Sequence, residues 1–267
     1  MSKANVEIIH QDNDIIVINK PSGVSVTADR SGQDQLVDIL SRQLGSGIAE
    51  CLRLIHRLDK HTSGVMMLAK NVRSQSLFSA YFAKRLVRKT YLAIVSGVVP
   101  GLEGTIDVPL ARDRKNPALM CIARKRGKEA ITAWKLLADF GLAALLAVSP
   151  LTGRTHQIRV HLPHIGLPLA IDPLYGSSQP LFLSDFKTDY RLGKDRTEKP
   201  LIDRLTLHAY QIEFVSPGPN LPEYFIAPLD KKFAAAIKML TKHNPNGLAA
   251  FVNQSNFRGI INAQRLD

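Results

Sequence analysis

The stretch HRLDKHTSGVMMLAK, residues 56–70, joins a polar segment to a short apolar run. The run VMMLA at 65–69 has the length and composition of a buried strand, and Gly64 permits tight backbone geometry just before it. Asp59 therefore stands in a turn that precedes a strand, where a carboxylate can act as a nucleophile or a base. An ordinary turn residue paired with a neighbouring basic side chain fits this segment equally well.

The rest of the chain indicates strands that follow one another with few helices between them. Runs typical of strands occupy residues 15–19, 65–69, 91–95, 105–110, 119–123, 131–137, 142–148, 205–215 and 224–226. Helical spacing of apolar residues occurs within 36–44, 77–82, 155–165 and 233–240. Gly45 is placed to end the first of these helices and Asp230 to cap the last, whereas Pro163 predicts a bend or an early stop. This order predicts the α+β class, with a mixed, largely antiparallel sheet flanked by helices.

Composition and charge restrict the possible partners. The 267 residues include 35 Lys and Arg against 23 Asp and Glu, which gives a formal net charge of +12 and favours a polyanion as partner. The longest nearly continuous apolar stretch, residues 142–148, is far shorter than the roughly 20 residues of a membrane span. The N-terminus lacks the apolar core of a signal peptide, and Cys51 and Cys121 lack metal-ligand spacing. We therefore expect a cytoplasmic protein with no membrane association.

The chain shows no repeat and no flexible linker, so we expect one catalytic domain over residues 1–242 and a C-terminal tail over 243–267. Residues 112–128 carry basic side chains on two arms around 119–123, and in a hairpin they would grip a nucleic-acid backbone; a solvated loop is the alternative. Residues 177–204 are polar and are expected to form a surface insertion.

The segment LTGRTHQIRVHL, residues 151–162, holds a second set of candidate residues. In a helix that starts near residue 155, His156 and Arg159 project away from the face of Ile158 and its apolar neighbours. Arg154, at the helix entrance, and Arg159 would then face one cleft. An amphipathic helix with a solvated basic side is the alternative.

Six segments together resemble, in order, the motifs of the RluA family of pseudouridine synthases. They are VINKPSGV (17–24), HRLDKHTSGVMMLAK (56–70), RKTYLAIVSG (88–97), LTGRTHQIRVHL (151–162), IDPLYG (171–176) and LHAY (207–210). The resemblance covers roughly residues 8–240. The motifs begin almost at once, so we expect a stand-alone synthase domain without the S4 RNA-binding domain of many relatives.

The resemblance implies isomerisation of uridines in structured RNA, ribosomal or transfer, by a monomeric enzyme that needs no cofactor and no metal. It also implies the synthase fold, with the active cleft across the middle of the sheet. Carried over by motif, Asp59 is the catalytic aspartate, Tyr91 the active-site tyrosine, and Arg159 the arginine paired with Asp59. Arg57 matches a residue thought to fill the gap left by the flipped base. The other residues expected to bind RNA or substrate are Lys20, His56, Thr62, Ser63, Gly64, Arg154, His156 and Gln157.

Two other functions remain open at this point. The histidines of the two basic segments suit acid–base or ligand roles in a nuclease; they are His56, His61, His156, His161 and His164. Strand scission would support a nuclease, and intact RNA with an altered nucleoside would exclude it. A non-catalytic RNA-binding module is the second possibility, against which the joint presence of Asp59, Tyr91 and Arg159 argues.

Overall fold

The protein divides into two compact units. The structure, a computed structural model, describes residues 5–27, 34–123, 125–187, 189–191, 197–215 and 221–266. The first unit is formed by Met1–Thr90 and His208–Pro228, and the second by Tyr91–Leu207 and Leu229–Asp267. Within the described ranges, no helix combines the length and the apolar composition that crossing a bilayer requires.

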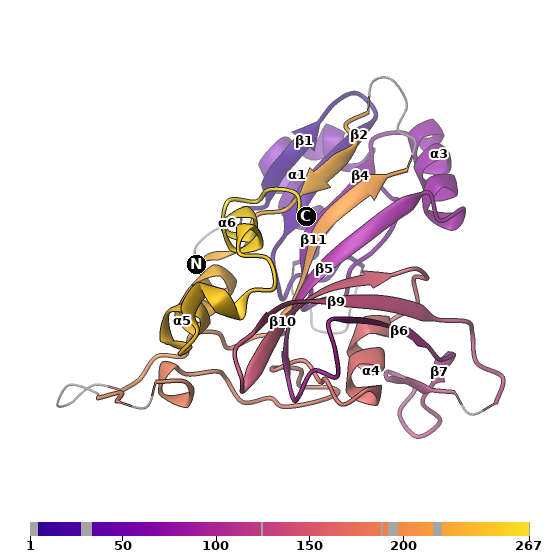
Figure 1. Cartoon of the computed structure of the whole chain (residues 1–267). Coiled ribbons are helices and arrows are strands. Elements are labelled where there is room, and N and C mark those ends of the chain that lie inside the picture. The colour runs from indigo at the N-terminus through magenta and orange to yellow at the C-terminus, as the bar shows by residue number, and fades with distance from the viewer. Residues whose placement is uncertain are drawn as a thin grey trace. The chain divides into compact units, whose positions relative to one another are not determined.

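The first unit is built on mainly antiparallel strands (Figure 1). Its elements are β1 (Glu7–Gln11), β2 (Ile15–Lys20), α1 (Leu36–Leu44), α2 (Ser46–Ala49), β3 (Arg53–Leu54), β4 (Ser63–Ala69), α3 (Val72–Ala83), β11 (Leu207–Phe214) and β12 (Tyr224–Ile226). Strands β1, β2 and β4 pair antiparallel in that order, and β11 pairs parallel with β4 through His208 and Ala209. Strand β12 pairs antiparallel with β11.

The strands β2 and β4 form as the sequence predicts. Every residue of β4 is buried, and so are five of the six residues of β2, so neither strand shows the alternation of a half-exposed sheet. Helix α1 ends at Gly45, whose φ of 91° lies in a region that favours glycine. The three predicted elements are therefore confirmed, although β2 extends one residue further, to Lys20, and β4 begins two residues earlier, at Ser63.

Gly64 lets β4 approach β11 closely. Its φ is +114°, and a Cβ atom built on it would lie 2.0 Å from the carbonyl oxygen of Ala209. The residue expected to bind substrate thus has a structural requirement of its own, because only a residue without a side chain fits between these strands.

The second unit contains a four-stranded antiparallel sheet in the order β5–β10–β9–β6. Its elements are β5 (Val87–Ser96), β6 (Glu103–Asp107), β7 (Leu110–Arg112), β8 (Met120–Ile122), β9 (Ile131–Asp139), β10 (Ala143–Pro150), α4 (Gln157–His164), the 3-10 helix η1 (Leu183–Asp185), α5 (Lys231–His243), the 3-10 helix η2 (Gly247–Ala250) and α6 (Ser255–Ile261). Strands β7 and β8 pair only with each other among the described strands, which confirms the expected hairpin.

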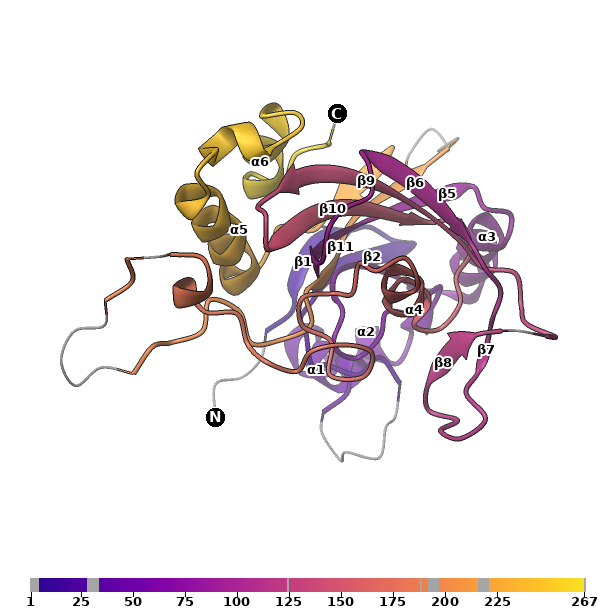
Figure 2. The same ribbon diagram turned by 60° about the horizontal axis from the view of Figure 1, so that its bottom comes forward.

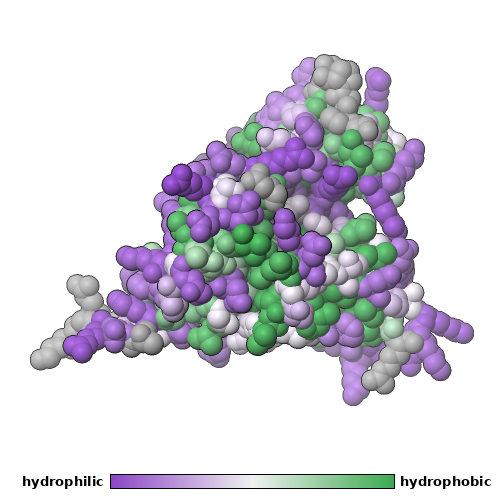
Figure 3. All heavy atoms as spheres, viewed as in Figure 1, coloured by the Kyte–Doolittle hydropathy of each residue, from purple (hydrophilic) through white to green (hydrophobic). Residues whose placement is uncertain are grey.

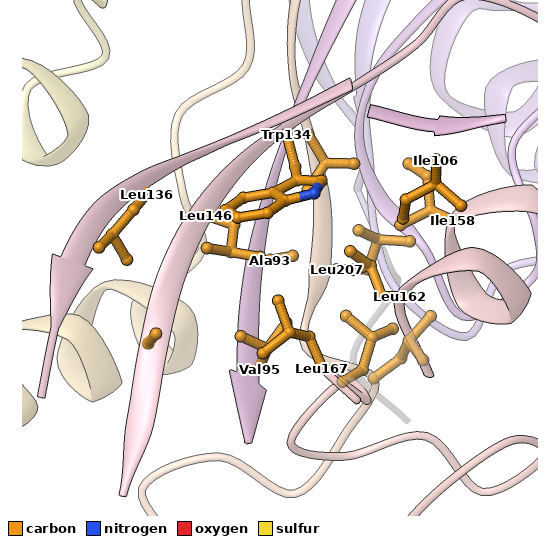
Figure 4. Packing of buried hydrophobic residues seen from close by; sticks show 14 residues of the cluster. Ala93, Val95, Ile106, Trp134, Leu136, Leu146, Ile158, Leu162, Leu167 and Leu207 are labelled. Atoms are coloured by element: carbon orange, nitrogen blue, oxygen red, sulfur yellow. The ribbon is translucent and has the colours of Figure 1, made fainter. Parts of the chain in front are cut away.

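Helix α4 packs against this sheet through a cluster of buried apolar side chains. Figure 4 shows Ile158 and Leu162 of α4 near Leu167 and Leu207, with Trp134 over the neighbouring strands. His161 fixes the other side of the helix, since its ring nitrogens lie 2.9 Å from Thr132 Oγ1 and from the carbonyl oxygen of Val108. The helix ends at His164, directly after Pro163, as the sequence predicts.

The C-terminal part folds further than the sequence indicates. Asp230 caps α5 by accepting from the backbone N–H groups of Lys232 and Phe233, as predicted. Beyond α5, where the sequence shows no readable pattern, the chain forms η2 and α6. The N–H of Val252 donates to the carbonyl oxygen of Leu137 in β9, so contacts distant in sequence fix this segment.

Two other expectations differ in detail. Residues 105–110 form the end of β6 and the start of β7 rather than one strand, and the helix expected near residue 155 begins at Gln157. Parts of other predicted segments lie outside the described residues: residue 124 of the basic segment, residues 188 and 192–196 of the expected insertion, and residues 216–220, where a turn between the last two predicted strands is expected from the Pro-Gly-Pro-Asn sequence. The α+β class and the mixed, largely antiparallel strand pairing are confirmed.

Replacing Gly64 with alanine should destabilise the protein strongly. The positive φ alone costs about 1–3 kcal/mol for a residue with a side chain, and the clash with Ala209 adds to this. Urea unfolding of Gly64→Ala measures the loss. Gly101→Ala is the control, because no atom lies within 4 Å of its added Cβ, and it should stay within about 0.5 kcal/mol of wild type. Equal stability of the two variants would contradict the close approach of β4 and β11.

Candidate active site

Backbone hydrogen bonds within the first unit hold the turn that carries Asp59. Asp59 is half-buried, and its carbonyl oxygen accepts from the N–H of Thr62 at 3.1 Å. The carbonyl oxygen of the next residue, Lys60, accepts from the N–H of Gly23 at 2.9 Å. The VINKPSGV segment and the HRLD segment therefore meet at this turn, and Asp59 stands on a fixed backbone.

Lys20 reinforces the same turn. It is fully buried, and its Nζ donates to the carbonyl oxygens of Pro21, Val24 and Lys60 at 2.9, 2.9 and 3.0 Å. An ammonium group has three N–H donors, and these three carbonyls can accept all of them. This geometry favours a positioning role for Lys20 over the predicted contact with substrate.

Thr62 and Ser63 are also buried behind the turn. The Oγ of Ser63 lies 2.9 Å from Nδ1 of His208, whose Nε2 lies 3.1 Å from the carbonyl oxygen of Ala227. Because that carbonyl can only accept, Nε2 carries the proton and Nδ1 accepts from Ser63. Ser63 thereby connects β4 to β11, whereas its predicted contact with RNA stays a prediction, as does that of Thr62.

His56 is packed as a neutral ring. Its Nε2 accepts from the backbone N–H of Met67 at 3.0 Å, and the ring stacks on Phe82 with 4.5 Å between centroids. Burial, together with the charge of Lys89, lowers the pKa of His56 to about 3. A proton acceptor that is already occupied by Met67 suits neither general acid nor general base chemistry at neutral pH. Arg57, by contrast, is exposed.

Arg159 lies in a buried ion pair within the second unit. Its Nε and Nη2 donate to the two carboxylate oxygens of Asp172 at 2.8 and 2.7 Å. The two side chains are only 3% and 2% exposed, so the alternative of a solvated basic helix face is wrong at this position. Because the fork is bidentate, the direction of the guanidinium plane is fixed.

Tyr175 completes the surroundings of Arg159. The guanidinium carbon of Arg159 lies 5.2 Å from the centroid of the Tyr175 ring. The Tyr175 hydroxyl lies 2.7 Å from Nδ1 of His156 and accepts from the backbone N–H of Met120 at 2.8 Å. His156 itself adopts a left-handed conformation with φ of 53°, which ends the loop before α4. The αL region costs free energy for a residue with a side chain and is enriched at functional sites.

Gln157 and Arg154 lie in different surroundings, and their expected contacts with RNA or substrate stay predictions. All polar atoms of the buried Gln157 are bonded within the second unit: its Oε1 accepts from Thr152 and from the N–H of Arg154, and its Nε2 donates to Ile131 and Thr132. Gln157 therefore holds the loop in place. Arg154 is exposed and donates to the carbonyl oxygen of Glu129, whereas Arg159 is enclosed, so the two do not share an environment.

Tyr91 lies in β5 opposite Val148 of β10, half-buried against the apolar cluster of the second unit. Asp59 belongs to the first unit, and Tyr91 and Arg159 belong to the second. The predicted pairing of Asp59 with Arg159 would involve one residue from each unit, and the predicted central cleft would involve both units. Both stay predictions.

Sequence reasoning missed Asp172 and Tyr175 as partners of Arg159. Both lie in the quoted segment IDPLYG, where an acidic residue directly follows an apolar run. That position is a usable signal, because a carboxylate at the edge of a buried run needs a cation or several donors. In the described part of the chain, no cluster of three or more His, Cys, Asp or Glu side chains is arranged to hold a metal ion.

Comparison with known proteins gives a consistent result. The family described as RNA pseudouridylate synthase matches residues 14–164. Ribosomal large subunit pseudouridine synthase D of Borreliella burgdorferi is 34% identical over 239 residues, which cover 87% of this chain and 68% of that protein. Synthase C of Buchnera aphidicola (subsp. Schizaphis graminum) is 36% identical over 227 residues, which cover 85% and 68%.

A solved structure shares the fold as well. Human RNA Pseudouridylate Synthase Domain Containing 4 superposes with a TM-score of 0.67 at 30% identity, and the match covers 88% of this chain and 92% of that chain. The synthase fold implied by the sequence motifs is thereby confirmed.

Removing the carboxylate of Asp172 should destabilise the protein by about 3–5 kcal/mol, because it leaves Arg159 charged and buried without its partner. Urea unfolding of Asp172→Ala measures this loss. The double variant Arg159→Met/Asp172→Leu should recover most of it, since no buried charge remains. Lys232→Ala is the control: it breaks an ion pair whose side chains are 52% and 39% exposed, and it should cost less than about 1 kcal/mol. A loss in Asp172→Ala no larger than in this control would argue against the pair.

The stability of the protein should fall as the pH drops below 6.5, in part because of His56. Its folded-state pKa of about 3 is below the ordinary 6.5, so between these values the unfolded chain binds a proton that the folded chain does not. The midpoint of thermal unfolding, followed from pH 7 to pH 4, should therefore depend less on pH in His56→Gln than in wild type. His164→Gln, which replaces an exposed histidine of α4, should keep the wild-type dependence. Identical curves for all three proteins would contradict the buried, neutral state of His56.

Proposed function

This chain belongs to the RNA pseudouridylate synthase family, and we propose that Asp59 is its catalytic carboxylate and that ribosomal RNA is its substrate. The observation that carries the assignment to Asp59 is its place on a turn fixed by Lys20 and by the N–H of Gly23. The names of the bacterial relatives, which refer to the large ribosomal subunit, support the choice of RNA.

The reaction is an isomerisation that needs no external reactant. The N1–C1′ bond of uridine breaks, the uracil turns, and a C5–C1′ bond forms; the proton on C5 then leaves while N1 gains one. Asp59 starts this sequence either by attacking covalently or by removing a proton from the sugar to give a glycal. Both routes need an anionic carboxylate beside the nucleotide, and a guanidinium next to it favours the charged form.

Arg159 and Tyr91 fit the remaining requirements. Arg159 would supply the cation for Asp59, and its orientation is set in advance by the bidentate contact with Asp172. Tyr91 would offer a ring on which the everted base stacks and a phenol near C5, where the proton departs. Taking a uridine out of structured RNA costs a few kcal/mol, so contacts elsewhere on the RNA must offset this cost.

The β7–β8 hairpin is suited to supply such contacts. Among the described residues of its arms, the exposed basic side chains are Arg112, Arg114, Lys115, Lys125, Arg126 and Lys128. Figure 3 shows hydrophilic side chains projecting at the lower right, where β7 lies in Figure 1. Phosphate contacts of this kind fix register and orientation without reading the base sequence. In the first unit, Lys84, Arg85 and Arg88 are also exposed and basic.

Asp59→Asn should abolish pseudouridine formation and leave RNA affinity within about twofold of wild type, because the basic side chains proposed to contact phosphate are unchanged. Nucleoside analysis of ribosomal RNA after incubation with each protein measures formation, and filter binding measures affinity. Full activity of Asp59→Asn would refute the role of this carboxylate. Cleaved RNA in place of altered nucleosides would instead indicate the nuclease alternative.

Charge removal from the hairpin should weaken RNA binding and reduce its salt dependence. For Arg114→Ala/Lys115→Ala, the slope of log K against log salt should become shallower by about 1.4, or about 0.7 for each lost contact to single-stranded RNA. Lys238→Ala/Lys242→Ala is the matched control, because it removes two exposed charges from α5. Equal slopes for the two double variants would show that the hairpin does not contact the phosphates.

A further inference from the structure

We propose that Tyr175 is a positioning residue that links the β7–β8 hairpin to Arg159, so that RNA held by the hairpin stabilises the orientation that Asp172 gives to Arg159 and thereby raises the turnover number. The inference rests on the proposed roles of the hairpin and of Arg159. Its new element is the mechanical connection between them, which is formed by one tyrosine within the second unit.

The hydroxyl of Tyr175 joins two segments that are distant in sequence. It accepts from the backbone N–H of Met120, the first residue of β8, at 2.8 Å. It also lies 2.7 Å from Nδ1 of His156, the residue that precedes α4. A shift of β8 along its own direction therefore breaks the hydrogen bond to Met120 or moves the Tyr175 side chain with it.

The ring of Tyr175 contacts the other end of this connection. The guanidinium carbon of Arg159 lies 5.2 Å from the ring centroid, in the range of a cation–π interaction. The same Arg159 is clamped in its plane by Asp172, whose Oδ1 also accepts from the backbone N–H of Tyr175 at 3.3 Å. Tyr175 and Asp172 are thus hydrogen-bonded to each other, and both contact the guanidinium of Arg159.

Apolar packing holds the base of the hairpin against α4. Leu110 of β7, Ala130 and Val160 of α4 form a small buried cluster, and Met120, Ile122 and Tyr175 pack against it. Figure 2 shows α4 beside β8 and β7. The basic side chains of the arms are exposed, whereas the base of the hairpin is packed against α4. RNA that displaces the arms would therefore also shift this base, where the Tyr175 hydroxyl is hydrogen-bonded to Met120.

The test is steady-state kinetics on an RNA substrate with Tyr175→Phe, which keeps the ring beneath Arg159 and removes only the hydroxyl. We expect kcat to fall by about tenfold, from loss of a hydrogen-bonded link, with KM changed less than about twofold. Arg114→Ala/Lys115→Ala should lower kcat and raise KM in the wild-type background, but only raise KM in the Tyr175→Phe background. Tyr224→Phe, which makes the same substitution at an exposed tyrosine of β12 in the first unit, should match wild type.

Each outcome bears on one claim. Wild-type protein that forms no pseudouridine refutes the proposed function itself. If wild-type turnover is normal, an unchanged kcat in Tyr175→Phe overturns only the proposed link between the hairpin and Arg159. The same holds if Arg114→Ala/Lys115→Ala lowers kcat equally in the wild-type and Tyr175→Phe backgrounds. If Tyr175→Phe does not fold, His156→Asn and His156→Gln replace it. The Asn side chain places a polar atom near the position of Nδ1, so His156→Asn should keep most of kcat. The Gln side chain reaches the position of Nε2 instead, so His156→Gln should lower kcat. A higher kcat in His156→Gln than in His156→Asn would overturn the link.

Discussion

The buried ion pair between Arg159 and Asp172 is the interaction on which the second unit depends. A guanidinium that is 3% exposed is tolerated only if its donors are satisfied, and Asp172 satisfies two of them in a planar fork. The pair does not simply add stability, since apolar residues of similar size could fill the same volume. What it provides is a guanidinium of fixed orientation near the start of α4.

In the first unit, the position of Asp59 is fixed in a comparable way. Asp59 is placed by backbone contacts around it: Lys20 is buried beneath the turn, and Gly64 permits the strand that follows to approach β11. The proposed catalytic groups of both units are therefore positioned by their own neighbours. An isomerase benefits from such preorganisation, because its substrate gains no external reactant and the catalytic groups must be in place when the base turns.

Much of the fold was accessible from the sequence, but the roles of several site residues were not. Short apolar runs identified β2 and β4, and Asp230 marked the start of α5, because local composition and capping decide those elements. Gln157 and Lys20 were expected to contact substrate, yet their polar atoms bond to carbonyl and hydroxyl groups that only the folded chain brings near. The segments η2 and α6 escaped prediction for the same reason. Motif spacing identifies which residues matter, whereas tertiary contacts decide whether they act on substrate or on one another.

A pseudouridine synthase exchanges the N1 attachment of uracil for a C5 attachment without breaking the RNA. Ribosomal RNA labelled with tritium at C5 of uridine reports this exchange, because the C5 proton leaves only when the new bond has formed. One tritium should be released to water for each pseudouridine found, with the strands intact. Uridine conversion without tritium release, or tritium-labelled RNA that is cleaved rather than isomerised, would contradict it.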